Sequence, residues 1–336
     1  MSPLDGSILL AFLEADGAAV SGDQLARSLG VSRVAIWGRL EKLREQGFAF
    51  AAAPRKGYRL TAAPAGAHGP WLEAHLRRRR CQVPCAVLAG VDSTNSEAER
   101  RLAAGEETPF AVLARTQTAG RGRLGRAWQS DRPGNLYLSL ALRPFIEVGR
   151  LGPFTTWMGL ALCEHLEAEL GVRLGLKWPN DLLDPAGRKV AGMLTEARVD
   201  ADTVRELVFG LGLNLEGPGG DWPAELRRRA GSLAALAGRT LDPSAAAAGV
   251  LAALEQAWEA FADGSFRRRF RILHERHDAL AGREVRVTLR GKPLAGVAEG
   301  VDDDGALRLR SARGKLTRVA SGEVTLRAPR GSGRVS

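Results

Sequence analysis

The sequence predicts an α+β protein of three parts: a helix-turn-helix unit with a hairpin, a mixed α/β domain and a small all-β barrel. Three observations support this fold class. Capped helical segments fill the first 60 residues, strand-like runs alternate with amphipathic helices in the middle, and short strands between Gly and Asp turns follow residue 281. The 336 residues are enough for two or three domains. We place the domains at residues 1–65, 66–280 and 281–330.

The N-terminal part contains three predicted helices. Residues 8–13 give a first apolar helical face, and Ser21 with Gln24 forms a capping box that opens a second helix. Gly30 ends that helix, and Ser32 caps the third. The pattern is helix, tight turn, helix.

A hairpin and a linker are predicted next. Strands over 48–53 and 58–60 flank the turn Pro54-Arg55-Lys56-Gly57, which would project two cations like a wing. Residues 61–69 are mostly small and precede a proline, so we expect a linker there.

The remaining elements follow from their periodicity. The expected central strands include 111–115 and 136–142, and the expected helices include 155–170 and 244–261. The expected C-terminal strands are 284–289, 294–301, 306–310 and 316–320.

Composition excludes several classes of protein. With 45% hydrophobic and 26% charged residues the chain is typical of soluble globular proteins, and neither a membrane span nor a signal peptide is evident. We therefore expect a cytoplasmic location and no membrane partner. Three cysteines are too few for a disulfide framework, and Cys81-x-x-x-Cys85 lacks a second ligand pair, so we expect no metal site in the protein. The net charge of +10 is compatible with nucleic acid or an acidic ligand.

The most distinctive motif is GRGRLGR at 120–126. Glycines let the backbone approach a ligand closely, and guanidinium groups hold phosphate or carboxylate oxygens bidentately. The spacing fits neither a Walker loop nor a Rossmann turn. Taken alone, the run is either an anion-binding loop, or a solvated Gly/Arg loop or nucleic-acid patch.

Neutral polar residues precede this loop. Asp92-Ser93-Thr94-Asn95 and Thr116-Gln117-Thr118 adjoin apolar strands. A Ser-Thr-Asn run by itself is most often a helix cap.

Three later segments are also ambiguous when taken singly. Residues 177–181, KWPND, fit a turn with a surface ion pair as well as a ligand site. Lys189 begins an apolar strand, and the glycines of 210–214 indicate that a ligand or neighbouring strand lies close.

In this order, segments 120–126, 177–181, 189–192 and 210–214 resemble the biotin protein ligase family, and the N-terminal part resembles that of the bifunctional members that also repress the biotin operon. The resemblance covers nearly the whole chain. It implies a winged helix-turn-helix, a central mixed-sheet α/β ligase domain like that of class II aminoacyl-tRNA synthetases, and a C-terminal SH3-like β-barrel.

The resemblance also implies an activity. Such ligases use ATP and Mg²⁺ to form biotinyl-5'-AMP, then transfer biotin to a lysine of biotin carboxyl carrier protein. Lys189 would neutralise charge between the biotin carboxylate and the α-phosphate. Arg123, also a catalytic residue by the resemblance, would form with Arg121 and Gly122 the loop that closes over biotin and the adenylate phosphate. Asp181 would accept a proton from the carrier lysine.

The binding residues implied by the resemblance fall into two sets. For biotin they are Ser93, Thr94, Asn95, Gln117, Arg121, Gly122, Arg123 and Lys189. For ATP and the adenylate they are Arg121, Arg123, Asn180, Asp181 and Asn214. Trp222, in the loop 217–222, would stack on adenine, and Leu124 replaces an arginine common in the family.

The N-terminal part would bind operator DNA of biotin genes, as part of a ligand-promoted homodimer. The expected contacts are Ser32, Arg33, Trp37, Arg39, Arg55 and Lys56. Gly38 is unusual inside a recognition helix, where it costs about 1 kcal/mol relative to Ala.

Three alternatives remain open at this point. The chain could be a ligase whose helix-turn-helix does not regulate, or a ligand-sensing regulator without catalysis, although a sensor has no need of Lys189. A lipoate ligase would show a different arginine and glycine signature before the lysine strand.

Overall fold

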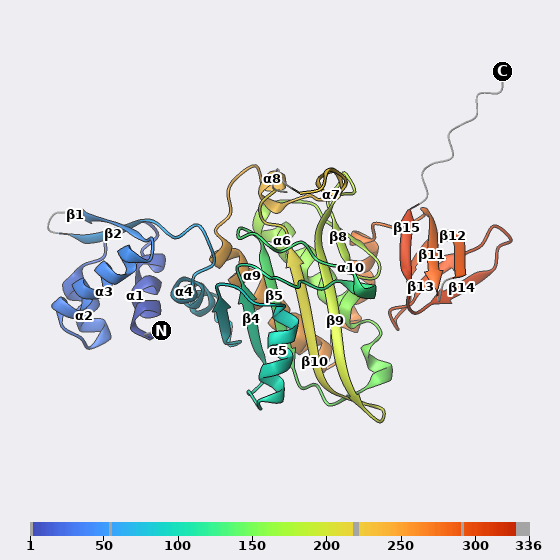
Figure 1. Cartoon of the computed structure of the whole chain (residues 1–336), viewed down its shortest axis with the longest axis horizontal. Coiled ribbons are helices and arrows are strands. Elements are labelled where there is room, and N and C mark those ends of the chain that lie inside the picture. Colours follow the sequence, from blue (N-terminus) through green and yellow to red (C-terminus); the bar gives the residue numbers. More distant parts are fainter. Residues whose placement is uncertain (1–2, 54–55, 218–221, 290–291, 327–336) are drawn as a thin grey trace, which may run out of the picture.

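The computed structural model describes residues 3–53, 56–217, 222–289 and 292–326. Figure 1 shows three parts in a row, with the N-terminal part and the C-terminal part on opposite sides of the central domain. The predicted three-part α+β architecture is confirmed. Within the described residues, no helix is both long enough and apolar enough to cross a bilayer.

The N-terminal part has the predicted helices. They are α1 (Pro3–Glu14), α2 (Gly22–Leu29) and α3 (Arg33–Glu45), followed by the hairpin strands β1 (Ala49–Ala53) and β2 (Gly57–Ala62). Ser21 and Ser32 cap α2 and α3 through hydroxyls that accept backbone N–H bonds, and Gly30 ends α2 with φ 64°. These predicted signals are confirmed.

The predicted linker over 61–69 is wrong in its bounds, because β2 continues to Ala62 and α4 (Gly69–Arg79) begins at Gly69. The segment between them is packed rather than free: the backbone N–H of His68 donates to Ser244 Oγ at 3.0 Å. In α4, Trp71 packs with the core of the N-terminal part and donates its indole N–H to Asp242 Oδ2 at 2.6 Å. Long-range contacts therefore bury a stretch whose composition is that of a loop.

The central domain contains a mixed sheet in the order β3-β4-β5-β10-β9-β8-β7, with β6 paired to β10. Among the strands of this sheet in the described residues, β3 and β4 pair in parallel and the other pairs are antiparallel. The strands are β3 (Cys85–Leu88), β4 (Phe110–Ala114), β5 (Leu136–Leu142), β6 (Ile146–Glu147), β7 (Gly175–Lys177), β8 (Asp181–Leu183), β9 (Lys189–Asp200) and β10 (Thr203–Leu213).

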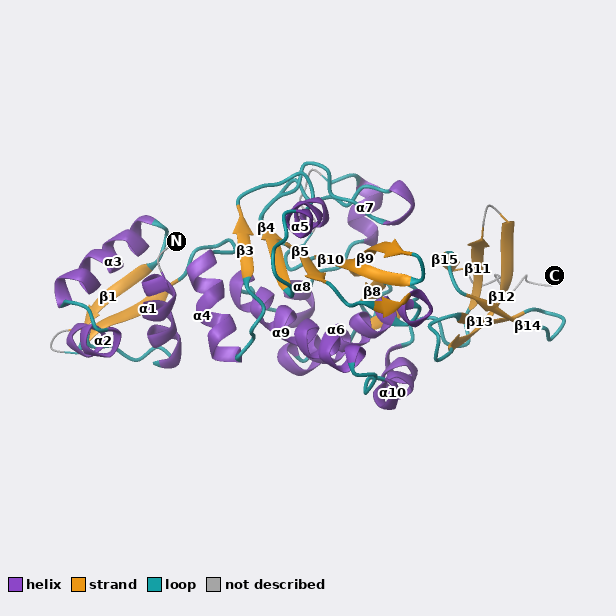
Figure 2. Cartoon of the chain, turned by 90° about the horizontal axis from the view of Figure 1, so that it is seen from below, coloured by secondary structure: helices purple, strands orange, loops and turns teal. Residues whose placement is uncertain are grey.

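Helices cover both faces of this sheet (Figure 2). On one face α5 (Thr94–Ala103) packs over β4, β5 and β10. On the other lie α6 (Phe154–Leu170), α9 (Pro243–Ala262) and α10 (Arg267–His277). The shorter helical elements are η1 (Arg123–Gly125), η2 (Val148–Leu151), α7 (Ala224–Arg229) and α8 (Leu233–Ala237).

The C-terminal part is a five-stranded antiparallel sheet in the order β14-β13-β12-β11-β15. Its strands are β11 (Glu284–Leu289), β12 (Lys292–Val301), β13 (Leu307–Arg310), β14 (Leu316–Val319) and β15 (Glu323–Leu326). The last strand was not predicted. Trp178 of the central domain joins the apolar core of this sheet and donates its indole N–H to Gly305 O at 3.0 Å, so the two parts share a core contact.

Candidate active site

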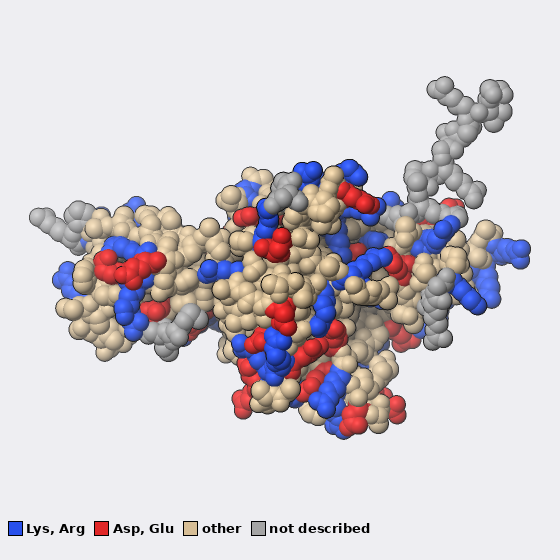
Figure 3. Space-filling view, in the orientation of Figure 1, with Lys and Arg blue, Asp and Glu red and all other residues tan. Residues whose placement is uncertain are grey.

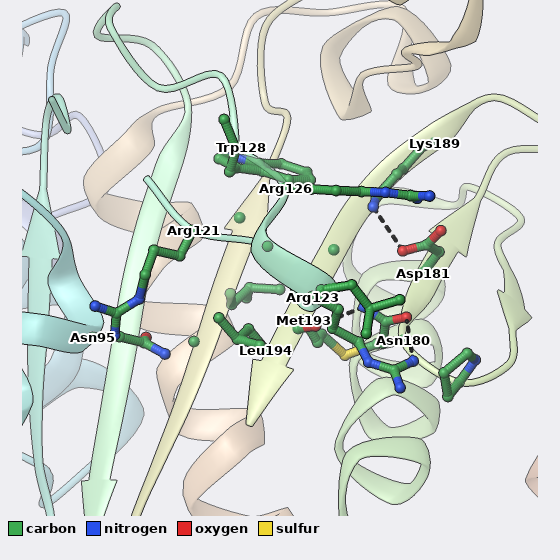
Figure 4. A pocket seen from close by; sticks show the side chains of 18 of the residues that line it. Asn95, Arg121, Arg123, Arg126, Trp128, Asn180, Asp181, Lys189, Met193 and Leu194 are labelled. Atoms are coloured by element: carbon green, nitrogen blue, oxygen red, sulfur yellow. Dashed lines mark hydrogen bonds and ion pairs between the residues drawn. The ribbon is translucent and has the colours of Figure 1, made fainter. Parts of the chain in front are cut away.

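One cavity gathers almost all the motifs that the sequence singled out. It lies between the start of α5, the loop 120–128, the hairpin β7–β8 and the facing ends of β9 and β10 (Figure 4). Residues 322–324 of the C-terminal sheet close one wall. Segments separated by more than two hundred positions in the sequence, such as Asn95 and Glu323, therefore line the same cavity.

Neutral polar groups form a recess at one end of the cavity. The backbone N–H of Thr94 donates to Gln117 Oε1 at 2.8 Å. Ser139 Oγ lies 2.8 Å from Thr94 Oγ1 and 2.6 Å from Asn95 Oδ1. Ser93 occupies the N-cap position of α5 but makes no side-chain capping bond, so its buried hydroxyl is not used to cap the helix.

Sequence reasoning missed Ser139. It is the single serine of strand β5, whose other residues are leucine, alanine and one tyrosine, and it is completely buried. Because a buried hydroxyl is costly without a hydrogen-bonding partner, a lone serine in a core strand is a usable signal for a polar site.

Arg121 lies beside this recess rather than near the lysine. Its guanidinium donates to Glu196 Oε2 at 2.8 Å and to Ser96 Oγ at 2.6 Å. Asn95 Nδ2 donates to the same carboxylate oxygen of Glu196 at 2.7 Å. Figure 4 shows the side chains of Arg121 and Asn95 close together. Burial, followed by the adjacent Glu196 carboxylate, raises the pKa of Glu99, which also faces Arg121. Glu196 was not anticipated, because only the folded sheet brings it to α5.

Lys189 and Asp181 meet at the opposite end. Lys189 Nζ lies 2.7 Å from Asp181 Oδ1 (Figure 4). Lys177 Nζ approaches the other carboxylate oxygen at 3.9 Å. Lys189 Nζ also lies 5.0 Å from the centre of the Trp128 ring, within the range of a cation–π contact.

Trp128 rests directly on the sheet, where two strands carry glycine. Gly192 of β9 and Gly212 of β10 are register partners. A Cβ added to Gly212 would lie 2.3 Å from the Trp128 ring, and one added to Gly192 would lie 2.8 Å from it. The strand glycines thus make room for an internal aromatic ring. Trp128 was missed because it follows the arginine motif in irregular chain, but the two glycines could have indicated a large neighbour.

A third glycine serves the recess. A Cβ on Gly210 would lie 2.3 Å from Asn95 Oδ1. The sequence indicated that a ligand or neighbouring strand lies close to 210–214. In the structure, the groups that lie against these glycines are the side chains of Asn95 and Trp128.

Arg123 lies between the central domain and the C-terminal sheet. Its guanidinium donates to Gly322 O at 3.3 Å and approaches Asn180 Oδ1 at 3.5 Å. Burial lowers the pKa of Arg123, but a guanidinium remains charged in proteins. Arg126 forms an ion pair with Glu323 of β15. Asn180 is itself fixed by donating Nδ2 to Met193 O at 2.8 Å.

Two expected residues do not line the cavity. The amide of Asn214 donates to Lys189 O at 3.2 Å and Gly231 O at 3.1 Å, so it braces the strand that carries Lys189. Trp222 is buried elsewhere and is absent from the cavity lining in the described part of the chain. Residues 218–221 of its loop lie outside the described residues.

The residues expected to contact DNA lie on α3 and the hairpin, and they differ in whether their side chains are exposed. Arg33, Trp37 and Lys56 are exposed. The Ser32 hydroxyl is engaged as a helix cap, and Arg39 is half-buried with its guanidinium 3.6 Å from Asp5 Oδ1. Arg55, also expected to contact DNA, lies outside the described residues.

The cavity suits an elongated ligand with two different ends. The recess offers neutral donors and acceptors, as an uncharged polar ring requires, whereas Lys189 and Arg123 offer cations for an anionic end. Trp128 lies between them with its ring available for apolar contact.

Comparisons with known proteins agree with this division. Residues 87–214 match the biotin/lipoate A/B protein ligase family, residues 7–59 match an HTH domain, and residues 281–327 match the biotin protein ligase C-terminal domain.

Individual relatives extend the match to nearly the whole chain. The bifunctional ligase/repressor BirA of Bacillus spizizenii is 31% identical over 331 residues, covering 97% of this chain and 99% of the relative. The biotin-[acetyl-CoA-carboxylase] ligase of Paracoccus denitrificans is 34% identical over 239 residues, 68% of this chain and 95% of the relative. The solved Aquifex aeolicus biotin protein ligase, in complex with biotin and ATP, is similar with a TM-score of 0.61 and 30% identity, covering 73% of this chain and 98% of that one.

Proposed function

The chain belongs to the biotin protein ligase family, and from that premise we infer that it is an ATP-dependent ligase that forms biotinyl-5'-AMP and transfers biotin to a carrier protein, and that it also represses transcription. The observation that carries the catalytic assignment is the pairing of Lys189 and Asp181 beside Trp128, across one cavity from the polar recess.

The recess receives the ureido ring of biotin. That ring carries a carbonyl acceptor and two N–H donors, which Thr94, Asn95 and Gln117 match with neutral groups. Ser139 connects Thr94 and Asn95, so it positions the groups that contact the ring. Arg121 and Glu196 hold the loop against α5 on the outside of the recess.

The carboxylate of biotin then points toward Lys189. In the first step a carboxylate oxygen attacks the α-phosphorus of ATP, the bond to the β-phosphate oxygen breaks, and pyrophosphate leaves. Two anions must approach each other, so the Lys189 cation lowers the barrier by neutralising their charge. Asp181 holds that ammonium group in place before the substrates bind.

The second step needs a proton acceptor. The amine of the carrier lysine attacks the acyl carbon, AMP leaves, and the amine loses a proton. Asp181 lies in the cavity at the cationic end, where its carboxylate can accept that proton. The carrier protein therefore approaches from the side of β8.

Mg²⁺ enters as the partner of the nucleotide. It prefers oxygen ligands and is usually held by one or two carboxylates together with substrate phosphates. The cavity is lined by two carboxylates, and Asp181 is the one that would fit this need because Glu323 is paired with Arg126. No cluster of three or more His, Cys, Asp or Glu in the described residues could hold a metal alone. When bound, Mg²⁺ supplies charge neutralisation for the phosphates.

Repression rests on the N-terminal helix-turn-helix. The relatives that align over nearly the whole chain carry the name ligase/repressor, and α2 and α3 have the capped geometry of the motif. Exposed Arg33 at the start of α3 and Lys56 of the hairpin supply phosphate contacts on operator DNA of biotin genes. We propose that biotinyl-5'-AMP promotes a homodimer, which sets two α3 helices at the spacing of two half-sites.

A single assay separates these activities. Labelled biotin, ATP and the host's biotin carboxyl carrier domain should yield a labelled carrier, and the same sample should retard a duplex from upstream of the host's biotin genes only when biotin and ATP are present. Transfer without any DNA binding would leave a ligase with a non-regulatory helix-turn-helix. DNA binding without transfer of biotin to the carrier would contradict the proposed ligase activity.

A further inference from the structure

We propose that Val34, Trp37 and Gly38 of α3 form an apolar reading face that contacts the 5-methyl groups of thymine in the major groove of the operator. The inference rests on the proposed repressor function and adds to it the chemistry by which the site recognises its sequence. These three residues together are called the reading face.

The reading face is exposed to an unusual degree for apolar residues. Val34 is 77% exposed and Trp37 is 54% exposed. They are three residues apart on α3, so they are neighbours on one side of the helix. Ile36, Leu40 and Leu43 on the opposite side are fully buried, so α3 already has its core contacts without them.

Gly38 has no role in packing that would explain it. A Cβ added there meets no atom within 4 Å, and its φ is not in the left-handed region. Glycine in a helix interior lowers helix stability, so its presence here needs a reason outside the fold. Gly38 follows Val34 by one helical turn and adjoins Trp37, which makes it a notch where a partner can approach the backbone closely.

The charges around the reading face favour DNA as the partner. Residues 33–40 contain no carboxylate, although Arg33 Nε lies 3.5 Å from Asp23 Oδ1 and Arg39 is paired with Asp5. Arg33 and Lys56 of the hairpin are exposed. The N-terminal half of such a helix is the part that contacts base edges. Among base edges in the major groove, the thymine methyl is the group that apolar side chains recognise.

The charge is too mixed to supply specificity by itself. Figure 3 shows acidic and basic side chains interspersed over the visible face of the N-terminal part, without a large patch of one sign. Because phosphate contacts carry no sequence information directly, discrimination must come from the base edges, and the reading face is where α3 offers contact area.

The test compares thymine with uracil, which differs only by lacking the methyl group. A duplex from upstream of the host's biotin genes is amplified once with dTTP and once with dUTP, and binding of the full chain with biotin and ATP is measured at fixed salt. We expect the uracil duplex to bind more weakly, by about 4-fold for each methyl group contacted. Equal binding of the two duplexes would overturn the proposal, while leaving operator binding intact.

Two variants locate the effect. Trp37→Ala should weaken binding to the thymine duplex and bring the ratio between the two duplexes close to one. Leu316→Ala is the matched control, since Leu316 is a 43% exposed apolar residue on the C-terminal sheet, and it should change neither value. A Trp37→Ala variant that keeps the full ratio would show that the methyl groups are read elsewhere, which contradicts the proposal.

Gly38→Ala separates binding from stability. The added methyl group meets open space, so the melting temperature should rise, as it does for most such exchanges in a helix. Affinity for the thymine duplex should nevertheless fall about tenfold, because the notch is filled. Unchanged affinity with a raised melting temperature would overturn the role of Gly38. If no duplex binds at all, nor any from a randomised pool, the repressor function fails and this inference fails with it.

Discussion

Lys189 Nζ lies 2.7 Å from Asp181 Oδ1, so the cation that adenylation requires is already paired within the protein. The pairing joins the start of β9 to the start of β8 across adjacent strands. It holds the ammonium group near the Trp128 ring, where an anionic substrate can exchange with the carboxylate.

Lys189→Ala should lose the first half-reaction. Removing a preorganised partner of transition-state charge costs about 10² to 10³ in rate, so pyrophosphate release with biotin and ATP should fall by that factor. Lys315, which directly precedes β14 and does not line the cavity, is the matched control: Lys315→Ala removes an equal charge and should have no effect. Near-normal pyrophosphate release by the Lys189 variant would contradict its assigned role.

Gly212→Ala should displace the Trp128 ring. The new Cβ would lie 2.3 Å from a ring atom, and an indole on a sheet cannot yield as a flexible side chain does. Biotin affinity, measured by calorimetry, should fall about 5- to 150-fold, which corresponds to the cost typical of overpacking, about 1–3 kcal/mol.

The same change in a Trp128→Ala background tests the cause. If the clash is the cause, Gly212→Ala should then cost little, and the two substitutions will be strongly non-additive. Gly149→Ala, where no atom lies within 4 Å, is the matched control. Additive losses would mean that Gly212 acts through something other than the ring.

Arg123→Ala should release the acyl adenylate. Arg123 reaches Gly322 O and so ties the arginine loop to the C-terminal sheet, which keeps water from the mixed anhydride. We expect biotinyl-5'-AMP to dissociate or hydrolyse at least tenfold faster, measured by its release after filtration. Arg121→Ala, which loses contacts to Glu196 and Ser96 instead, should affect biotin affinity more than intermediate lifetime. The reverse ranking would mean that the two arginines have exchanged roles.

Acid should destabilise the protein at a pH where carboxylates remain charged. Burial lowers the pKa of His68, His75 and His165, so the unfolded chain takes up more protons than the folded one near the ordinary histidine pKa. The contribution of these three histidines to the free energy of unfolding is therefore fully present above about pH 6.5 and is lost as the pH falls below it. The melting temperature should drop between pH 7.5 and 5.5.

The pair formed by His274 and Asp278 contributes less to this loss of stability in acid. Burial lowers the pKa of His274 and raises that of the adjacent Asp278, and the two shifts have opposite effects on stability as pH falls. His68→Gln removes one of the remaining groups and should flatten the profile by up to about 1.4 kcal/mol per pH unit. A pH-independent melting temperature in this range would contradict the burial of these rings.

Local signals predicted the elements well where they act over a few residues. Ser21, Gly30 and Ser32 mark helix ends in the sequence because capping depends on neighbours within one turn. β15 was missed because four residues carry too little pattern, and its place depends on pairing with β11. The linker was misplaced because only distant residues such as Ser244 bury it.

The residues of the candidate site also differ in whether the sequence alone could identify them. Lys189, Asp181 and Gln117 stand in motifs that are continuous in the sequence, so resemblance finds them. Ser139 lies inside a strand with no neighbouring motif, and Glu196 lies in β9 beyond the motif at 189–192. Both contact Asn95 only through sheet register and the packing of α5. No periodicity along the chain carries that information.

The bond from Arg123 to Gly322 joins positions 199 residues apart. Contacts of such separation form late, because closing a long loop costs entropy that only further contacts repay. During refolding, the central sheet can bring Lys189 and Asp181 together while the wall at 322–324 is still missing. During refolding, the ability to hold a long-lived acyl adenylate should therefore return later than helical and sheet structure. The lifetime of the bound acyl adenylate would thus report when the last step of folding is complete.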